Sequence, residues 1–227
     1  MQAGRFIPYG ADHLIVIACL LAGAAVLIAS RAWLQRQDAL LLRRMLAVLL
    51  LGQGVGAWSL AWARGSRYVP FQLCDLTLVL AAFALWRPAP LVSELVYFWG
   101  LAGSVQALAT PALEAPFPSS AWLTFFLSHG GVILTALYLA ASGKVRPTPA
   151  GILRAWLLIH VYAAAAGIVN WLAGTNYGYL AHKPSQPSLL DHLGPWPVYI
   201  AAMDVIALVS SLLCYAPYAL NTTRRER

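Results

Sequence analysis

The chain has 227 residues, of which 60% are hydrophobic and only 10% are charged, and its formal net charge at pH 7 is +7. Charged residues make up about a quarter of a soluble domain, so this composition excludes an ordinary soluble globular protein. The positive charge does not indicate nucleic-acid binding, because the basic residues lie at the ends of apolar segments, where they meet anionic lipid headgroups. We therefore expect an integral membrane protein with no nucleic-acid partner.

Apolar segments long enough to cross a bilayer recur along the whole chain. In chain order we expect seven transmembrane helices, at residues 11–30, 40–62, 71–86, 91–110, 120–142, 151–173 and 196–218. Gly52, Gly54 and Gly56 in the second segment indicate close helix packing. No connecting loop has the length of a second domain, so residues 1–227 are expected to form a single transmembrane domain. The predicted fold is all-α, a polytopic integral membrane helix bundle.

The first segment has one alternative interpretation, which is a cleavable signal peptide. Arg5 precedes the apolar run, and the residues around Ser30 are small enough for cleavage. However, more positive charge follows the run than precedes it, which favours an uncleaved helix whose N-terminus lies outside. We therefore expect residues 11–30 to remain as the first helix.

The basic residues are distributed unequally between the two sides of the membrane. If the seven helices alternate in direction, eleven of the fifteen Lys and Arg residues lie on one side. They are Arg31, Arg36, Arg43, Arg44, Arg87, Lys144, Arg146, Arg154, Arg224, Arg225 and Arg227. The other side holds Arg5, Arg64, Arg67 and Lys183. Because basic loops stay in the cytoplasm, we expect the N-terminus outside, the C-terminus inside and a multi-pass location in the bacterial inner or plasma membrane.

Polar residues within the expected helices gather toward the outer half of the bundle. At 1.5 Å per residue, Cys74 and Asp75 lie about 5–8 Å inward, Asp204 about 10 Å and His129 about 13 Å. Three further polar candidates lie near the outer ends of the fourth and sixth helices, and they are Gln106, Thr110 and Asn170. An ionisable group in lipid needs a partner or a role, so a cluster drawn from separate helices is typical of a ligand or reaction chamber. Glu94 and His160 are the exceptions in the inner half, and Glu94 is expected to be solvated at the cytoplasmic end of its helix.

Cys74 and His129 are candidates for a nucleophile and its base. A cysteine attacks as the thiolate, and an adjacent imidazole can take its proton and later return it to a leaving group. The pair suits acyl transfer from an ester through a thioester. A third polar group must orient the imidazole, and we consider Asp204, Asn170 and Asp75 in that order of preference. The alternative is that the cysteine only packs and the histidine is a satisfied structural residue.

Other polar residues fit the same scheme in supporting roles. Thr110, Gln106, Ser128 and Asn170 could donate hydrogen bonds to an oxyanion. Their alternative role is hydrogen bonding between helices. No soluble cofactor is required by this chemistry.

The longest loop, at about residues 174–195, lies outside and is typical of a binding loop or lid. Within it, Asn176 and Tyr177 are candidates for substrate binding, and Lys183 could meet a lipid phosphate. Three further side chains of this loop have metal-ligating chemistry but the spacing of no standard metal site, so no metal is expected. They are His182, Asp191 and His192.

Five segments in order resemble one known family. They are Val69–Leu76 with its Pro-x-x-Leu-Cys pattern, Glu94–Gly103, Ala109–Pro111, Phe125–Gly130, and Asn170-Trp171 before Asn176-Tyr177. From about residue 5 to 215 the chain resembles the YwaF-type bacterial integral membrane family, which is related to transmembrane protein 164, a eukaryotic phospholipid acyltransferase. The resemblance implies a multi-helix fold and a Cys/His acyl-transfer site, with the family's cysteine and histidine at Cys74 and His129. Gln72 departs from the pattern, because relatives often carry histidine there, although glutamine can replace a histidine that only donates a hydrogen bond.

The residues and the resemblance together predict a phospholipid acyltransferase. It would move an acyl chain between a glycerophospholipid and a lysophospholipid through a thioester on Cys74, with His129 as base, within the lipid bilayer. One alternative is a lipid hydrolase that uses the same pair with water as acceptor. The other is a small-molecule transporter or substrate-binding membrane protein, which would use the polar cluster without a nucleophile.

Overall fold

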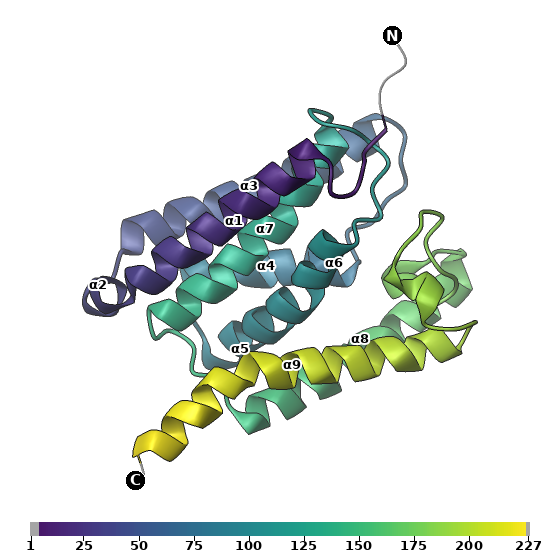
Figure 1. Cartoon of the computed structure of the whole chain (residues 1–227). Coiled ribbons are helices and arrows are strands. Elements are labelled where there is room, and N and C mark those ends of the chain that lie inside the picture. Colours follow the sequence, from purple (N-terminus) through teal and green to yellow (C-terminus); the bar gives the residue numbers. More distant parts are fainter. Residues whose placement is uncertain (1–4, 226–227) are drawn as a thin grey trace.

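The computed structural model describes residues 5–225, with side chains described up to residue 220. Every regular element in this range is a helix (Figure 1). The α-helices are α1 (Ala11–Ala29), α2 (Arg31–Arg36), α3 (Leu40–Ala63), α4 (Leu73–Trp86), α5 (Pro90–Trp99), α6 (Val105–Ala109), α7 (Ser120–Ala141), α8 (Pro149–Ala173) and α9 (Val198–Arg225). A π-helical segment, Gly100–Ser104, joins α5 to α6 without a break, and two short 3-10 turns lie at Tyr177–Tyr179 and Leu189–His192.

Six helices of the described chain are long and apolar enough to cross a membrane. They are α1, α3, the continuous helix Pro90–Ala109, α7, α8 and α9, and they correspond to six of the seven predicted segments. The remaining segment forms α4, which has 14 residues. At 1.5 Å per residue α4 is about 21 Å long, which is shorter than a hydrocarbon core of about 30 Å. An all-helical, multi-pass membrane protein is therefore supported, while the count of seven spans and the orientation of the termini stay predictions.

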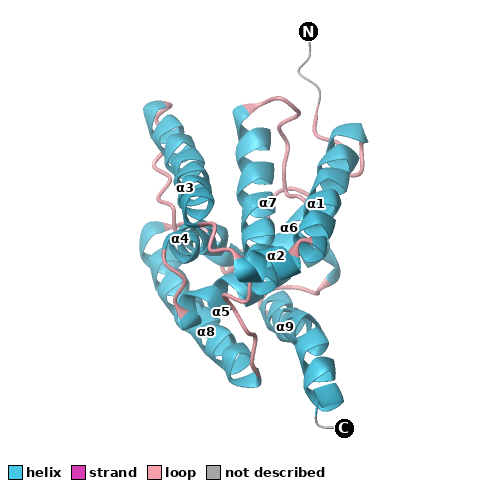
Figure 2. Cartoon of the chain, turned by 90° about the vertical axis from the view of Figure 1, so that its left-hand side faces the viewer, coloured by secondary structure: helices cyan, strands magenta, loops and turns pink. Residues whose placement is uncertain are grey.

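The short helix α4 lies at the centre of the bundle with α5 and α7. Every residue of α5 from Ser93 to Phe98 is buried. Helix α7 lies between α1 and α3 (Figure 2), and α8 and α9 pack on the other side, against α5 and the π-helical segment. A Cβ at Gly54 of α3 would lie 3.1 Å from Leu78 of α4, whereas Gly52 and Gly56 face open space, so one of the three predicted packing glycines makes the helix contact.

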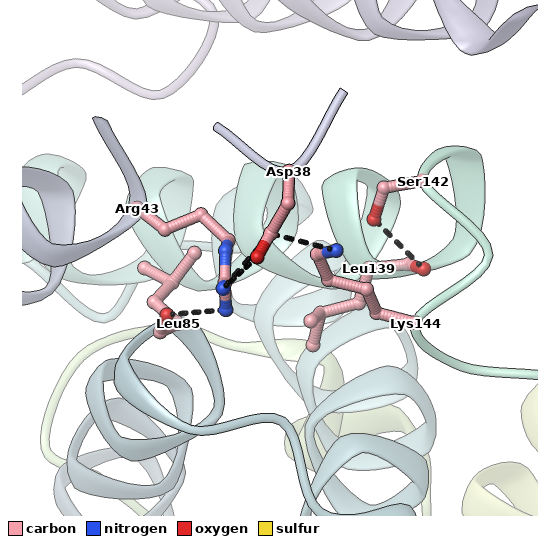
Figure 3. Close-up of polar contacts among 6 residues, drawn as sticks. All are labelled: Asp38, Arg43, Leu85, Leu139, Ser142 and Lys144. Carbon is pink, nitrogen blue, oxygen red and sulfur yellow. Dashed lines mark hydrogen bonds and ion pairs between the residues drawn. The ribbon is translucent and has the colours of Figure 1, made fainter. Parts of the chain in front are cut away.

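A charged cluster holds one end of the bundle together (Figure 3). Asp38, in the loop before α3, pairs with Arg43 at 3.0 Å and with Lys144 at 3.2 Å. The buried Arg43 side chain also donates a hydrogen bond of 3.1 Å to the carbonyl of Leu85 near the end of α4. The hydrogen bond from Lys144 and the two positive charges lower the pKa of the Asp38 carboxyl. The start of α3 thereby meets the end of α4, so these two helices run in opposite directions.

The expectation that Glu94 is solvated was wrong. Its side chain is 8% exposed, and its carboxylate pairs with Arg154 of α8 at 2.6 Å and accepts a hydrogen bond of 3.1 Å from Thr148. The Thr148 hydroxyl also caps α8, because it accepts from the backbone N–H of Gly151 at 2.9 Å. The beginning of α8 therefore covers the carboxylate, which the sequence placed at an exposed helix end.

The glycine at position 151 leaves the space for this carboxylate, so we expect opposite effects from two glycine substitutions in α8. A Cβ at Gly151 would lie 2.5 Å from Oε1 of Glu94, so Gly151→Ala must displace the ion pair and is expected to lower stability by about 1–3 kcal/mol. Gly167 has no atom within 4 Å of its added Cβ, so Gly167→Ala is expected to raise stability by up to about 1 kcal/mol through helix propensity. Thermal unfolding of both variants in one detergent checks this, and equal shifts would contradict the packing argument.

Candidate functional site

A cavity of about 380 Å³ lies between α3, α4 and α7, near the beginning of α4. Its wall contains Cys74 from the first turn of α4 and His129 from α7, together with Asp75 and Ser128. Most of the other wall residues are apolar. We call this space the Cys74 cavity. The structure thus brings the two candidate catalytic residues from separate helices to one cavity.

Hydrogen bonds at the beginning of α4 fix the position of Cys74. The backbone N–H of Gln72 donates to the Asp75 carboxylate at 3.0 Å, which forms half of a capping box. The Tyr68 hydroxyl donates to the same carboxylate. The side-chain oxygen of Gln72 accepts from the backbone N–H of Gly178 at 2.9 Å. Gln72 therefore joins α4 to the loop at residues 174–195, which we call the outer loop after its predicted side of the membrane, and does not line the Cys74 cavity.

The backbone of α7 sets the tautomer of His129. Its Nδ1 lies 2.8 Å from the carbonyl oxygen of Phe125, and since a carbonyl only accepts, Nδ1 carries the hydrogen. In the neutral ring Nε2 then keeps its lone pair and is able to accept a proton. The imidazole is buried against the ring of Phe125, with 4.4 Å between the ring centroids. The Asp75 carboxylate lies in the wall of the same cavity.

Asp204, the residue we first expected to orient His129, lies elsewhere. It lines a separate cavity of about 270 Å³ between α5–α6, α8 and α9, which we call the Asp204 cavity. Its Oδ1 is 3.6 Å from Nε2 of His160 on α8. Asp75 is therefore the carboxylate in the wall of the Cys74 cavity, although we placed it last of the three candidates.

Asn170, the second of those candidates, holds the outer loop. Its buried amide donates to the carbonyl of Tyr177 at 3.0 Å and accepts from the Tyr177 backbone N–H at 2.7 Å. The Thr175 hydroxyl adds a bond of 2.9 Å to the same amide oxygen. The Tyr177 hydroxyl in turn donates to the carbonyl of Val69 before α4, at 2.9 Å. Asn170 thus positions the loop against α4 and makes no hydrogen bond to His129.

Of the four predicted oxyanion donors, only Ser128 lines the Cys74 cavity. Its hydroxyl oxygen accepts from the side-chain amide of Gln53 at 2.8 Å. Gln106 donates to Ser210 at 3.3 Å, and Thr110 donates to the carbonyl of Gln106 at 3.2 Å. Sequence reasoning missed Gln53, whose signal was a polar side chain within an apolar, glycine-rich helix.

A polar cavity of about 530 Å³ lies next to the Cys74 cavity, between the loops that follow α3, α6 and α8, and we call it the loop cavity. Asn176 and Tyr177 line it, as does Gln72. Tyr68 lines both this cavity and the Cys74 cavity, so the two spaces adjoin at this residue. Burial and the hydrogen bond to Asp75 raise the pKa of the Tyr68 hydroxyl, which therefore stays protonated as a donor.

The cation of the loop cavity is Arg67 and not the predicted Lys183. Arg67 lines the cavity wall, whereas the Lys183 ammonium lies over the ring of Tyr199, 5.6 Å from its centroid. Arg64, three residues earlier at the end of α3, lines the Cys74 cavity. The sequence feature that could have identified Arg64 and Arg67 is that they are two of only four basic residues predicted on their side of the membrane.

The loop residues considered as metal ligands are not brought together. Nδ1 of His182 lies 3.0 Å from Nδ2 of Asn176, and the Asp191 carboxylate caps the backbone of Ser188 at 2.8 Å. In the part of the chain that the structure describes, no group of three or more histidine, cysteine or acidic side chains is arranged to hold a metal ion.

The candidate site lies within the part of the chain that matches a known protein family. The model of the TMEM164 family matches residues 8–215, which include Cys74, His129 and the outer loop. No curated protein and no solved structure matches the chain.

Proposed function

Since the chain belongs to the TMEM164 family, we propose that it is a membrane-embedded acyltransferase that moves an acyl chain between a glycerophospholipid and a lysophospholipid. The observation that carries this proposal is that Cys74 and His129 line one cavity, with the Nε2 lone pair of the imidazole free. The largely apolar wall suits an acyl chain, and the surrounding apolar helices suit a substrate that arrives from the bilayer.

In the first half of the reaction His129 acts as base and then as acid. Nε2 takes the proton of the Cys74 thiol, and the sulfur attacks the carbonyl carbon of the phospholipid ester. A C–S bond forms, the ester C–O bond breaks, and the imidazolium returns the proton to the oxygen of the departing lysolipid. The acyl chain then rests on the protein as a thioester.

In the second half a lysolipid hydroxyl collects the acyl chain. The hydroxyl gives its proton to Nε2 of His129 as its oxygen attacks the thioester carbon. A C–O bond forms, the C–S bond breaks, and the Cys74 sulfur recovers a proton from the imidazolium. The cycle returns both side chains to their starting state and needs no oxidant, reductant or cofactor.

Two neighbouring groups support this chemistry. The Asp75 carboxylate lies in the same cavity wall, and its negative charge favours the imidazolium that forms when His129 takes the thiol proton. The Ser128 oxygen already accepts a hydrogen bond from Gln53, so its own hydrogen is available for the oxyanion of the tetrahedral intermediate.

The loop cavity is our proposed site for the polar headgroup. It adjoins the Cys74 cavity at Tyr68, and Arg67 supplies a guanidinium that pairs well with phosphate. Asn176 and Tyr177 line the same wall. With the orientation that the basic residues predict, this cavity would face the outer leaflet.

Labelled lipid tests the proposed reaction and its two alternatives together. Purified protein in lipid nanodiscs receives a phospholipid with a radiolabelled acyl chain. We expect label on the protein that neutral hydroxylamine releases, and transfer of this label to added lysophospholipid. Release as free fatty acid whether or not lysophospholipid is present would instead identify a hydrolase with the same pair. Absence of protein-bound label, with solute uptake by protein-containing liposomes, would identify a transporter.

A further inference from the structure

The Asp204 cavity is a second candidate site, separate from the Cys74 cavity. It shares no wall residue with the Cys74 cavity. The first turn of α4 separates the two, because Leu73 lines the Asp204 cavity while the next residue, Cys74, lines the other. Whatever occupies the Asp204 cavity is therefore bound by residues that the proposed acyl transfer does not use.

An ionisable pair lies in the wall of this cavity, within two apolar helices. Nδ1 of His160 donates to the carbonyl of Trp156 at 2.8 Å, so Nε2 is the ring nitrogen that faces Asp204. Side chains of this kind within a membrane bundle are costly and usually serve a bound group. The side chains of His160 and Asp204 are 48% and 34% exposed, so both remain accessible.

The spacing of the pair leaves a place for one more polar atom. Nε2 of His160 and Oδ1 of Asp204 are 3.6 Å apart, which is longer than a direct hydrogen bond of about 2.7–3.2 Å. An oxygen beside the pair can lie about 2.8 Å from both atoms at once. Among the described residues, no side chain or backbone group donates a hydrogen bond to the Asp204 carboxylate, so it retains accepting capacity.

The rest of the wall restricts what that polar atom belongs to. No lysine or arginine lines the cavity, so His160 and Asp204 supply its charged groups. As an ion pair they offer one donor, Nε2–H, and one acceptor, the carboxylate, which match a ligand group that both donates and accepts a hydrogen bond. A carboxylate or phosphate only accepts, and an ammonium only donates. The other wall residues are mainly aromatic and aliphatic, among them Phe98, Trp99 and Met203. The volume of about 270 Å³ lies just below the usual range for ligand pockets, which begins at about 300 Å³, so it suits one alkyl chain better than two.

We propose that the Asp204 cavity binds a single-chain lipid whose polar group is a hydroxyl. The hydroxyl hydrogen is donated to the Asp204 carboxylate, and the hydroxyl oxygen accepts from His160 when the ring is protonated. The alkyl chain lies against the aromatic and aliphatic wall. This binding is separate from acyl transfer and persists if the proposed enzymatic activity is absent.

Photoreactive amphiphiles test this site directly. Purified protein in nanodiscs is irradiated with diazirine derivatives of dodecanol, dodecanoic acid and dodecylamine, and labelled peptides are identified by mass spectrometry. We expect the alcohol to label peptides of α8 and α9 at least about tenfold more than the acid or the amine does. Asp204→Asn removes the charge at constant size, and Ala207→Phe fills the cavity from its wall, so both are expected to lose this label.

Two controls separate the site from its surroundings. Asp191→Asn removes a carboxylate from the outer loop, and Cys74→Ala alters the other cavity, so both should label as the unchanged protein does. Undiminished labelling in Asp204→Asn and Ala207→Phe would overturn the site, and labelling by the acid or the amine equal to that by the alcohol would overturn the ligand class. Loss of the α8 and α9 label in Cys74→Ala would overturn the independence of the two cavities.

Discussion

Cys74→Ala is expected to abolish the hydroxylamine-sensitive acyl label and to lower acyl transfer by at least about a thousandfold. Alanine has no nucleophilic atom, so neither the C–S bond nor the thioester can form. The cavity otherwise changes little, because the sulfur is a small part of its wall and the capping bonds of α4 come from Gln72 and Asp75. Residual activity near that of the unchanged protein would exclude Cys74 as nucleophile.

The other two cysteines provide matched controls for this prediction. Cys19 is exposed on α1 and Cys214 is partly buried on α9, and neither lines the Cys74 cavity. Cys19→Ala and Cys214→Ala should therefore keep the label and the transfer rate. Loss of the label in either variant, with retention in Cys74→Ala, would move the nucleophile to another helix.

The Cys74→Ser variant distinguishes a nucleophilic cysteine from a purely structural one. If Cys74→Ser still accepts the acyl chain, the product is an oxygen ester, which resists neutral hydroxylamine. We expect slow accumulation of label that survives this treatment, since the hydroxyl is a weaker nucleophile and a poorer leaving group than the thiol. A label that stays hydroxylamine-sensitive in Cys74→Ser would show that the acyl chain is attached at a different cysteine.

Much of the fold could be predicted because bilayer thickness restricts it so strongly. A helix such as α7 needs about 20 apolar residues, and segments of that length are visible in a single sequence. The segment predicted at residues 71–86 was already the shortest of the seven, and α4 is two residues shorter because Gln72 caps its start. The exact ends of a helix depend on such local contacts, which a hydropathy pattern does not contain.

A count of residues along each helix predicts a depth for the candidate residues, but not the direction in which each side chain points. Cys74, His129, Asp75 and Asp204 were placed in one layer, since depth follows from counting residues at 1.5 Å each. Which cavity a side chain reaches depends on helix rotation and on neighbouring helices. Asp204 consequently lies beside His160, while Asp75, which we had placed last, lies with the cysteine and histidine.

Long-range partners were the least predictable feature. Glu94 meets Arg154 sixty residues later in the chain, and Gln72 meets Gly178 across the outer loop. Each contact depends on two distant segments of the chain packing together, and the sequence does not show which segments are neighbours. Intramembrane polar residues predict that a partner exists, because an unpaired group is costly, but they do not identify it.

His129→Ala is the second large expected effect, with a loss of about a hundredfold to ten-thousandfold in acyl transfer. Without the imidazole no group takes the thiol proton, and none returns a proton to the departing lysolipid. The rate of acylation in this variant should then rise about tenfold per pH unit, because only thiolate formed by hydroxide can attack. The unchanged protein should have a flatter profile.

His129→Gln separates proton transfer from packing. Glutamine fills much of the imidazole's space and can hydrogen-bond to the Phe125 carbonyl, yet its amide does not accept a proton at neutral pH. The same loss and the same steep pH dependence in His129→Gln as in His129→Ala would assign the effect to the base. His192→Ala, in the outer loop, is the control that should leave both unchanged. Recovery of activity by glutamine would reduce His129 to a structural residue, and the free Nε2 on which the proposed mechanism depends would then have no role in it.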